Sequence, residues 1–439
     1  MMKLTSEARM VGRRNFLKAV AGTSALAALG TTATLRGPVR GGPVRAALIG
    51  YGKQGKVLLD NIDPELMTIS AICDISPSTN KGANDAGVTW HRDWRRMLEE
   101  ERVEAVLIAT PLSTHAEIAT ACLQAGKHVF CETAMAMDVV GCGQMLQAAE
   151  KSKRLLQIGY QDFYQPHYWA AYRNIVMKGV LGDVYTVEGA WHVATSGRVK
   201  TTSGTGNFDP RAWGYPSLDE LLNWRLYRRY SKGMMTEHGG ALVSLTNWFF
   251  DSVPVAVKAS GGVFSYRDGR DVADHVFTTL EYPHSRTATI SLIQSNGFEG
   301  SYIQFLGTKG TLIIGRDEAL LFTEVGSRAA KVGALELKSS QPVLDTSASR
   351  SAEASSHSVL AGGETSEFAQ GREAFQREIA AFCGAIRAHA PLRCDPVHAF
   401  EVARTSFAVD EAVEQNQHSG PQALNPFSRS RDIHEGMLV

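Results

Sequence analysis

Residues 44–55 read VRAALIGYGKQG, an apolar run that ends in Gly50, Gly52 and Gly55 and leads into a helical pattern. A dinucleotide-binding turn between a strand and a helix has this form. The first glycine permits the tight turn, the second lets the backbone approach a pyrophosphate, and the third lets the helix pack closely on the sheet with its N-terminus facing the phosphates. The stretch therefore predicts a dinucleotide site. The expected contacts in this loop are Gly50, Tyr51, Gly52, Gln54 and Gly55.

The next predicted strand indicates which dinucleotide binds. Residues 66–75, LMTISAICDI, bring Asp74 to the position where an acidic side chain meets the ribose hydroxyls of the adenosine. A carboxylate there repels a 2′-phosphate, and no arginine follows at once to compensate, since the next residues are Ile75, Ser76 and Pro77. The pattern therefore predicts NAD over NADP.

Strand and helix patterns alternate from residue 44 to residue 158, after a Gly/Pro-rich linker over 37–43. Alternation of this kind predicts an α/β fold with a doubly wound parallel sheet. The expected strands are AALIG, SAICDI, AVLIAT, HVFCE and LLQIGY.

The run 105–110 is a continuous apolar strand that Pro111 breaks at its carboxyl end. Ligands bind at that end of open α/β sheets. We therefore expect Thr110, Pro111 and His115 to border the cofactor, although an ordinary position at the start of a helix suits His115 equally well.

Beyond Gly159 consecutive strand patterns joined by short turns predict a large, open, mostly antiparallel sheet. The Ser/Ala/Gly-rich residues 339–367 predict a mobile loop, and two helices follow that could pack back on the first domain. The predicted strands are 184–191, 255–261, 276–282, 287–294, 302–306 and 311–314, and the helices are 372–388 and 396–416.

The N-terminus carries Arg13 and Arg14 in the stretch GRRNFLK, followed by a short apolar run over 19–29. This order resembles a twin-arginine export signal, with an ordinary N-terminal helix as the alternative. Export to the periplasm or beyond through the twin-arginine machinery is the prediction. The twin-arginine pathway carries folded proteins, so it suits a protein that acquires its nicotinamide cofactor in the cytoplasm before export. No clear cleavage site follows, so retention as an anchor stays open.

Composition favours a small-molecule partner. Lys plus Arg and Asp plus Glu number 45 each, so no net field attracts nucleic acid or an anionic membrane. Hydrophobic residues make up 44% of the chain and charged residues 21%, as in a soluble globular protein of two domains. The six cysteines show no metal-ligand spacing, so we expect buried thiols and no metal site.

The fingerprint, ATPLSTH (109–115), AGKHVFCETAM (125–135) and MMTEHGGALVSLTNWFF (234–250) together resemble the glucose–fructose oxidoreductase and inositol dehydrogenase family, Gfo/Idh/MocA, over about residues 44–320. The resemblance implies an N-terminal Rossmann domain that holds NAD or NADP, with Glu132 and Thr133 beside the cofactor. It also implies a C-terminal α/β domain that walls the substrate and forms a dimer or tetramer. Family members usually oxidise or reduce a sugar or cyclitol carbon.

On this basis we divide the chain into four parts. These are a signal and linker over 1–43, the Rossmann domain over 44–158, the substrate and oligomer domain over 159–322, and a Ser-rich loop with C-terminal helices over 323–439.

The family's two proton-handling residues are replaced. Thr133 stands where the E-K-P motif has its lysine, and Ala241 stands where D-x-G-x-H has its histidine, with Glu237 at the aspartate. A positioned acid or base contributes about 10²- to 10⁴-fold to such a reaction, and a threonine hydroxyl does not ionise in the working range.

Three explanations compete for this loss. Neighbouring groups could handle the proton, the site could run redox-neutral glycoside cleavage with bound NAD, or the chain could bind a nucleotide or sugar without catalysis. The proposed catalytic residues are His238, Tyr164 and His192, with Lys232 a weaker candidate. Each candidate also has a structural interpretation. His238 could be a buried histidine, Tyr164 an aromatic core residue, His192 the end of a strand and Lys232 a solvated lysine. Arg225 could be a structural ion-pair partner.

Overall fold

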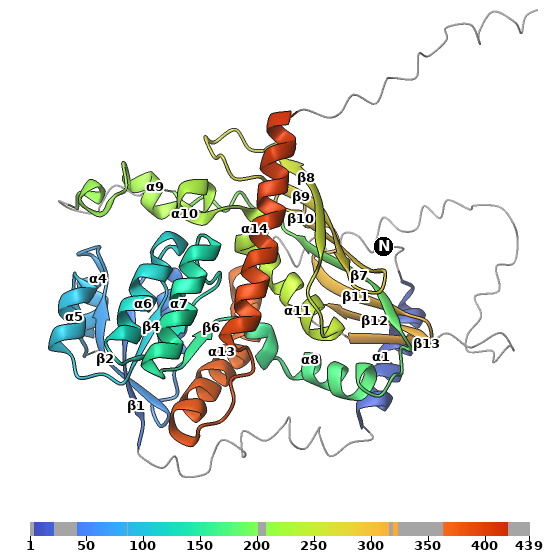
Figure 1. The fold of residues 1–439 in the computed structure, drawn as a ribbon, viewed down its shortest axis with the longest axis horizontal. Helices are drawn as coiled ribbons and strands as arrows, with labels where there is room; N and C mark the ends of the chain where they lie inside the picture. The colour runs from blue at the N-terminus through green and yellow to red at the C-terminus, as the bar shows by residue number, and fades with distance from the viewer. Residues whose placement is uncertain are drawn as a thin grey trace, which may run out of the picture.

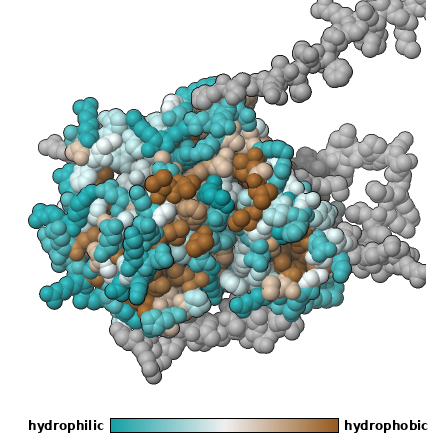
Figure 2. All heavy atoms as spheres, in the orientation of Figure 1, coloured by the Kyte–Doolittle hydropathy of each residue, from teal (hydrophilic) through white to brown (hydrophobic). Residues whose placement is uncertain are grey.

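The computed structural model describes residues 4–21, 42–85, 87–200, 208–315, 319–323 and 363–419. Two sheets stand side by side, and a long helix, α14 (Pro396–Ser419), runs between them (Figure 1). On the face seen in Figure 2, hydrophobic surface gathers toward the centre and the margins are mostly hydrophilic.

The first sheet has six parallel strands in the order β3-β2-β1-β4-β5-β6. This confirms the predicted doubly wound sheet, in which the strand order reverses between β1 and β4 and opens a ligand crevice at the carboxyl ends. The sequence interpretation missed the three-residue strand β3. The strands are β1 (Val44–Ile49), β2 (Met67–Cys73), β3 (Thr89–His91), β4 (Ala105–Ile108), β5 (His128–Cys131) and β6 (Leu156–Ile158).

Helices cover both faces of this sheet. Leu58 and Ala83 share one apolar cluster with Phe382 of the C-terminal region, so that α13 packs on the same face as α3 and α4. The opposite face packs against α5, α6, α7 and α14. These helices are α3 (Lys53–Asp60), α4 (Thr79–Asp85), α5 (Trp94–Glu100), α6 (His115–Gln124), α7 (Val139–Ser152) and α13 (Gly363–Ala388).

The second sheet has seven strands in the order β13-β12-β11-β7-β10-β9-β8, with β7 and β10 parallel and the other neighbours antiparallel. The helix α11 (Gly240–Phe250) packs on one face, where Leu242 lies against Gly189. The strands are β7 (Val184–His192), β8 (Ala256–Gly262), β9 (His275–Tyr282), β10 (Arg286–Ile293), β11 (Ser301–Gly307), β12 (Gly310–Gly315) and β13 (Ala319–Thr323).

Short helices form two connections, one after β6 and one after β7. The connection after β6 is made by η3 (Gln161–Tyr164), α8 (Pro166–Ala171) and the π-helix η4 (Tyr172–Val176). A further set follows β7 and ends at the π-helix η7 (Met235–Gly239), which leads into α11. That set is η5 (Pro210–Trp213), α9 (Leu218–Leu222), η6 (Trp224–Leu226) and α10 (Arg228–Ser231).

The N-terminal helix α1 (Ser6–Ala21) lies along the edge strand β13 (Figure 1). Phe16 and Val20 are buried, whereas Arg13 and Arg14 are exposed. Covering an edge strand blocks pairing with another chain. Among the described helices none is long and apolar enough to cross a membrane.

Part of the predicted mobile loop is helical. Residues 339–362 lie outside the described residues, but 363–367 already belong to α13, which begins nine residues before the predicted start at 372. All six cysteines are buried and free, as predicted.

Candidate cofactor and proton-transfer site

The glycine loop between β1 and α3 has the geometry that its sequence predicts. Gly50 has φ +92°, and a Cβ there would lie 2.6 Å from the Ala109 carbonyl. At Gly55 a Cβ would lie 2.0 Å from the Gly50 oxygen, so α3 packs directly on the turn. Gly52 has no atom within 4 Å of an added Cβ, which leaves room for a pyrophosphate at the start of α3.

Asp74 lies beside this loop at the carboxyl end of β2. Its Oδ2 accepts a hydrogen bond from the Tyr51 backbone N–H at 2.7 Å, and Oδ1 accepts one from the Ser76 N–H at 2.8 Å. Burial raises the pKa of this carboxyl despite those bonds. The Tyr51 ring packs against Gly82, so Tyr51 contributes its backbone, and not its ring, to the glycine loop. These groups fit the adenosine and pyrophosphate parts of NAD.

The loop after β4 is braced by protein contacts. The Thr114 hydroxyl donates to the Thr110 hydroxyl oxygen at 2.8 Å, and Pro111 precedes the short helix η2 (Leu112–Thr114). His115 is 1% exposed, with Nδ1 2.8 Å from the Ala134 carbonyl oxygen and Nε2 2.9 Å from that of Thr110. Burial lowers its pKa. His115 therefore joins the loops after β4 and β5 through its side chain, and its place beside the cofactor stays a prediction.

Glu132 connects the end of β5 to the glycine loop. The Gln54 amide donates to its Oε1 at 2.7 Å, and Gly159 leaves the space that its Oε2 occupies. Burial raises the pKa of Glu132 to about 7. Thr133 follows directly, so the position of the family lysine lies beside a carboxyl that titrates near neutrality.

Arg225, on η6, supplies a cation that the sequence analysis treated as structural. Its Nε donates to Glu237 Oε2 at 3.0 Å, and its guanidinium lies 4.1 Å from the Trp224 ring centre. Its charge lowers the pKa values of Glu132, Glu237 and His238. Arg225 therefore lies among the groups that surround the missing lysine, although these residues are far apart in the chain.

Glu237 is the second buried carboxyl of the site. Its side chain is 3% exposed, and its Oε1 has no hydrogen-bond partner among the described residues. Burial raises its pKa to about 7, against the opposing effect of Arg225. An unpaired buried oxygen with this pKa can accept a proton at neutral pH.

His238 lies next to Glu237 but in a different environment. Its ring stacks on Trp191, with ring centres 4.2 Å apart and planes 8° from parallel. Burial lowers its pKa to about 3. The ring therefore stays neutral at physiological pH and accepts a proton less readily than Glu237 does. The catalytic role predicted for His238 stays a prediction.

His192 does not join the residues around Arg225. Successive side chains of a strand point to opposite faces, so His192 lies on the face away from Trp191 and His238. Its Nδ1 is 3.0 Å from the Phe298 carbonyl oxygen and its Nε2 is 2.9 Å from the Ser291 hydroxyl. Its supporting role in catalysis stays a prediction.

Tyr164 and Lys232 are also held elsewhere. Tyr164 is 1% exposed, and its phenol interacts with Glu378 and Arg393 of the C-terminal region, where burial raises its pKa well above the ordinary value. Lys232 pairs with Glu411 of α14 at 2.9 Å. Both therefore contact the C-terminal region, and the catalytic role expected of Tyr164 stays a prediction.

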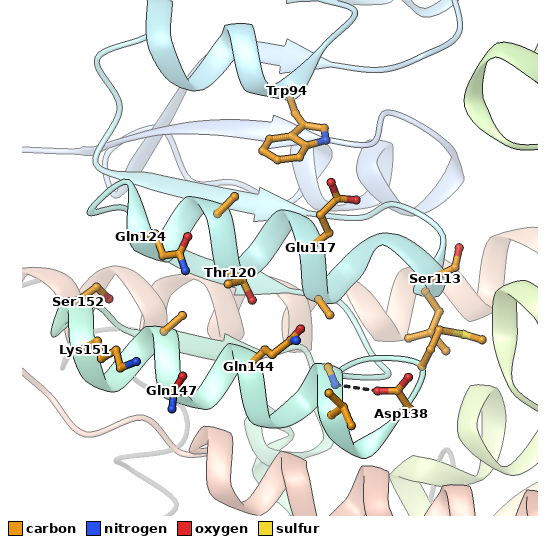
Figure 3. A pocket seen from close by; sticks show the side chains of 17 residues that line it. Trp94, Ser113, Glu117, Thr120, Gln124, Asp138, Gln144, Gln147, Lys151 and Ser152 are labelled. Atoms are coloured by element: carbon orange, nitrogen blue, oxygen red, sulfur yellow. Dashed lines mark hydrogen bonds between the residues drawn. The ribbon is translucent and has the colours of Figure 1, made fainter.

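A surface cavity of about 970 Å³ lies apart from this site, between α6 and α7 on the outside of the first domain (Figure 3). Polar side chains such as Gln124, Gln144 and Lys151 line it. None of the predicted site residues contributes to it. In the part of the chain that the structure describes, no three His, Cys, Asp or Glu side chains form a group able to hold a metal ion.

Two family descriptions match most of the chain. Residues 44–160 match "Oxidoreductase family, NAD-binding Rossmann fold", and residues 173–420 match "Oxidoreductase family, C-terminal alpha/beta domain". The first match confirms that residues 44–160 form an NAD-binding domain.

Curated relatives match mainly over part of their length. Identity to an inositol 2-dehydrogenase of Salmonella typhimurium is 28% over 159 residues, which are 35% of this chain and 47% of that protein. An alpha-N-acetylgalactosaminidase of Bacteroides fragilis is 31% identical over 159 residues, 34% of this chain and 37% of its own. A glycosyl hydrolase family 109 protein of Stenotrophomonas maltophilia is 29% identical over 223 residues, 46% of this chain and 48% of its own. The chain thus spans about half, or less, of these relatives.

Solved structures share the fold over nearly their whole length. The WlbA dehydrogenase of Bordetella pertussis, solved with NADH and UDP-GlcNAcA, has a TM-score of 0.63 at 17% identity and covers 86% of this chain and 98% of its own. The scyllo-inositol dehydrogenase of Lactobacillus casei, solved with NAD(H) and scyllo-inositol, has a TM-score of 0.61 at 18% identity and covers 85% and 98%.

Proposed function

This chain belongs to the Gfo/Idh/MocA oxidoreductase family, and from that membership we propose that it transfers a hydride between NAD and a carbon of a sugar, cyclitol or glycoside. One observation carries the proposal beyond the fold. Glu237, with one oxygen that has no hydrogen-bond partner in the described part of the chain, and Arg225 lie with Glu132 next to the glycine loop, where the family lysine is missing.

Bound NAD would supply the hydride acceptor, held by backbone atoms of the loop containing Gly50 and Gly52 and by Asp74. The Gln54–Glu132 pair fixes the end of β5 beside it. Gly52 leaves space beside the start of α3, since an added Cβ there meets no described atom within 4 Å.

In this proposal Glu237 accepts the hydroxyl proton of the substrate during oxidation and returns it during reduction. Its pKa of about 7 is close to the pH at which a general base works best. The Arg225 guanidinium takes over the positive charge of the missing lysine. Thr133 contributes no charge.

A direct test is to supply NAD with a panel of cyclitols, free sugars, sugar acids and aryl glycosides and to follow NADH formation. We expect turnover of at least one member, and its loss in Gly52→Ala, in which the added methyl occupies the open approach while the fold remains. Turnover by none of them, with NAD bound, would favour the non-catalytic alternative. The matched control is Gly143→Ala, where a Cβ also meets no atom within 4 Å.

Redox-neutral glycoside cleavage is the second candidate, favoured by similarity to an alpha-N-acetylgalactosaminidase and a glycosyl hydrolase family 109 protein. In that reaction the hydride taken from a sugar carbon returns to the same sugar after the glycosidic bond is broken. Release of the aryl group without net NADH formation would identify it. Net NADH formation with an intact glycoside would exclude it for that substrate.

We also propose that the protein is exported through the twin-arginine pathway and works outside the cytoplasm as a dimer or tetramer. The paired Arg13 and Arg14 support export, and both side chains are exposed on α1. Phe277, 49% exposed on β9 of the second sheet, supports an oligomer contact. Cell fractionation of the parent and of an Arg13→Lys, Arg14→Lys variant tests export. The native mass of the purified protein tests the oligomeric state.

A further inference from the structure

The N-terminal helix α1 is attached to the second sheet by one of its sides. Gly12, Phe16 and Val20 follow one another at intervals of four residues, so they lie on the same side of the helix. A Cβ at Gly12 would lie 2.6 Å from Cζ of Phe322, and the side chains of Phe16 and Val20 are buried. This side of α1 therefore packs closely on the edge strand β13, which contains Phe322.

A second apolar stripe runs along the side of α1 that faces away from β13. Met10 and Leu17 are 69% and 51% exposed, and their spacing of seven residues places them above one another on the helix. Packing on β13 does not account for them, because that contact uses the side that carries Phe16. A helix with one apolar side packed and another in water is suited to a second contact.

Basic side chains surround this second stripe. The helix carries four basic residues and one acidic residue, Glu7. Three of the basic side chains are exposed beside the stripe and line a depression in the surface together with it. We call this set the outer face of α1, and it consists of Met10, Arg13, Arg14, Leu17 and Lys18.

The outer face combines charges and apolar side chains in the way that an anionic bilayer surface requires. Methionine and leucine side chains enter the boundary between headgroups and acyl chains, while the long stems of arginine and lysine let their charges stay beside the lipid phosphates. A nucleic acid would use the charges but leave the apolar side chains in water. The whole chain has no net charge, so no overall field adds to the attraction that α1 exerts.

We propose that the folded protein binds an anionic membrane surface through the outer face of α1 while the helix stays packed on β13. The helix then lies in the plane of the interface and does not cross the bilayer. In Figure 1, α1 lies on the side of the second sheet away from the Rossmann sheet, so a bilayer at α1 leaves the cofactor crevice uncovered. The proposal depends neither on hydride transfer nor on export.

The first test is sedimentation of the uncleaved full chain, verified by its intact mass, with two kinds of vesicle. One kind contains phosphatidylglycerol and phosphatidylcholine, and the other contains phosphatidylcholine alone. We expect binding to the anionic vesicles that weakens as the salt concentration rises, because salt screens exposed charges. Equal binding to both kinds of vesicle, or binding to neither, would overturn the proposal.

Variants then assign the binding to the outer face. The pair Arg13→Gln, Arg14→Gln should weaken binding about 30-fold, which corresponds to about 1 kcal/mol for each charge. The pair Arg13→Lys, Arg14→Lys keeps both charges and should bind as the parent does, which separates lipid binding from recognition by the export machinery. Leu17→Ser should weaken binding about tenfold through the lost apolar contact.

Val140→Ser, at a 69% exposed valine of α7, is the control for Leu17→Ser and should bind as the parent does. Parent-like binding by the glutamine pair or by Leu17→Ser would refute the assignment to the outer face.

Hydrogen exchange tests whether α1 stays on the edge strand during binding. The backbone amides of residues 319–323, which form β13, should exchange at the same rate with and without anionic vesicles. Faster exchange in the presence of vesicles would show that α1 leaves β13 and turns Phe16 and Val20 toward the bilayer. That result would overturn the proposed arrangement.

Discussion

The glycine loop and the proton-transfer site lie at the same edge of the first sheet but are built differently. In the loop, backbone atoms set the geometry and each oxygen of the Asp74 carboxylate accepts one hydrogen bond from a backbone N–H group. At the proton-transfer site, side chains from the end of β5 and from the segment 225–237 meet, and one Glu237 oxygen has no hydrogen-bond partner among the described residues. The comparison teaches that a ligand-binding backbone tolerates little change, whereas proton handling can move to another side chain nearby.

Glu237→Gln tests the second half of this comparison most severely. The amide keeps the size and a bond from Arg225 but cannot accept a proton, so turnover should fall about 10²- to 10⁴-fold, as for a lost general base. The measurement is kcat with a verified substrate, together with the NADH dissociation constant. Glu411→Gln, at an exposed ion pair with Lys232, serves as control. Unchanged kcat in Glu237→Gln would return the role to His238.

Gly55→Ala tests the first half. Its Cβ would lie 2.0 Å from a backbone oxygen, which cannot move without deforming the turn, so the free energy of unfolding should fall by about 3 kcal/mol. Urea denaturation measures this change. Gly52→Ala should unfold like the parent and lose only NAD binding. Equal stabilities for Gly55→Ala and the parent would mean that the turn can adjust.

Glu378→Gln tests how a buried carboxyl without a hydrogen-bond partner among the described residues affects the free energy of unfolding, at a position outside the proposed site. Glu378 is fully buried in α13, neither of its oxygens has a partner within the described chain, and burial raises its pKa well above the ordinary value. Above the ordinary pKa the unfolded chain releases this proton while the folded chain keeps it, so rising pH favours unfolding. The free energy of unfolding should fall by up to about 1.4 kcal/mol per pH unit from this group.

In Glu378→Gln that part of the pH dependence should disappear, so the variant gains stability over the parent as the pH rises from 5 to 8. Thermal unfolding across this range measures the difference. A constant difference at every pH would show that Glu378 does not hold its proton.

Arg225→Met sharpens the electrostatic side of the comparison. Arg225 lowers the pKa of Glu237, so its removal should shift the rise of the pH–rate profile for oxidation, near 7 in the parent, to higher pH. Methionine keeps much of the length that packs on Trp224. If the maximal rate falls while the midpoint of the pH–rate profile stays at the same pH, Arg225 positions the substrate and does not shift the pKa of Glu237.

His238→Phe should have the smallest effect. Phenylalanine keeps the stack on Trp191, and a histidine with a pKa of about 3 handles little proton transfer at neutral pH. We expect kcat to change by less than about tenfold, below the range of a lost general base. A larger loss with the stack preserved would contradict the assignment to Glu237.

The sequence by itself determined the Rossmann fold, the mostly antiparallel second sheet and the dinucleotide loop. These features depend on local spacing: glycines at fixed intervals, strand periodicity and an acidic residue one strand later. It also identified the missing lysine and histidine, because those positions follow short motifs around Thr133 and Ala241.

Only the tertiary structure decided which side chains replace them. Glu132 is far in the chain from Arg225 and Glu237, and no local pattern indicates that the three residues meet. The pKa values that distinguish Glu237 from its neighbour His238 arise from burial and a through-space charge, which sequence does not encode locally. The face to which His192 points was likewise decided only by the sheet that forms around its strand.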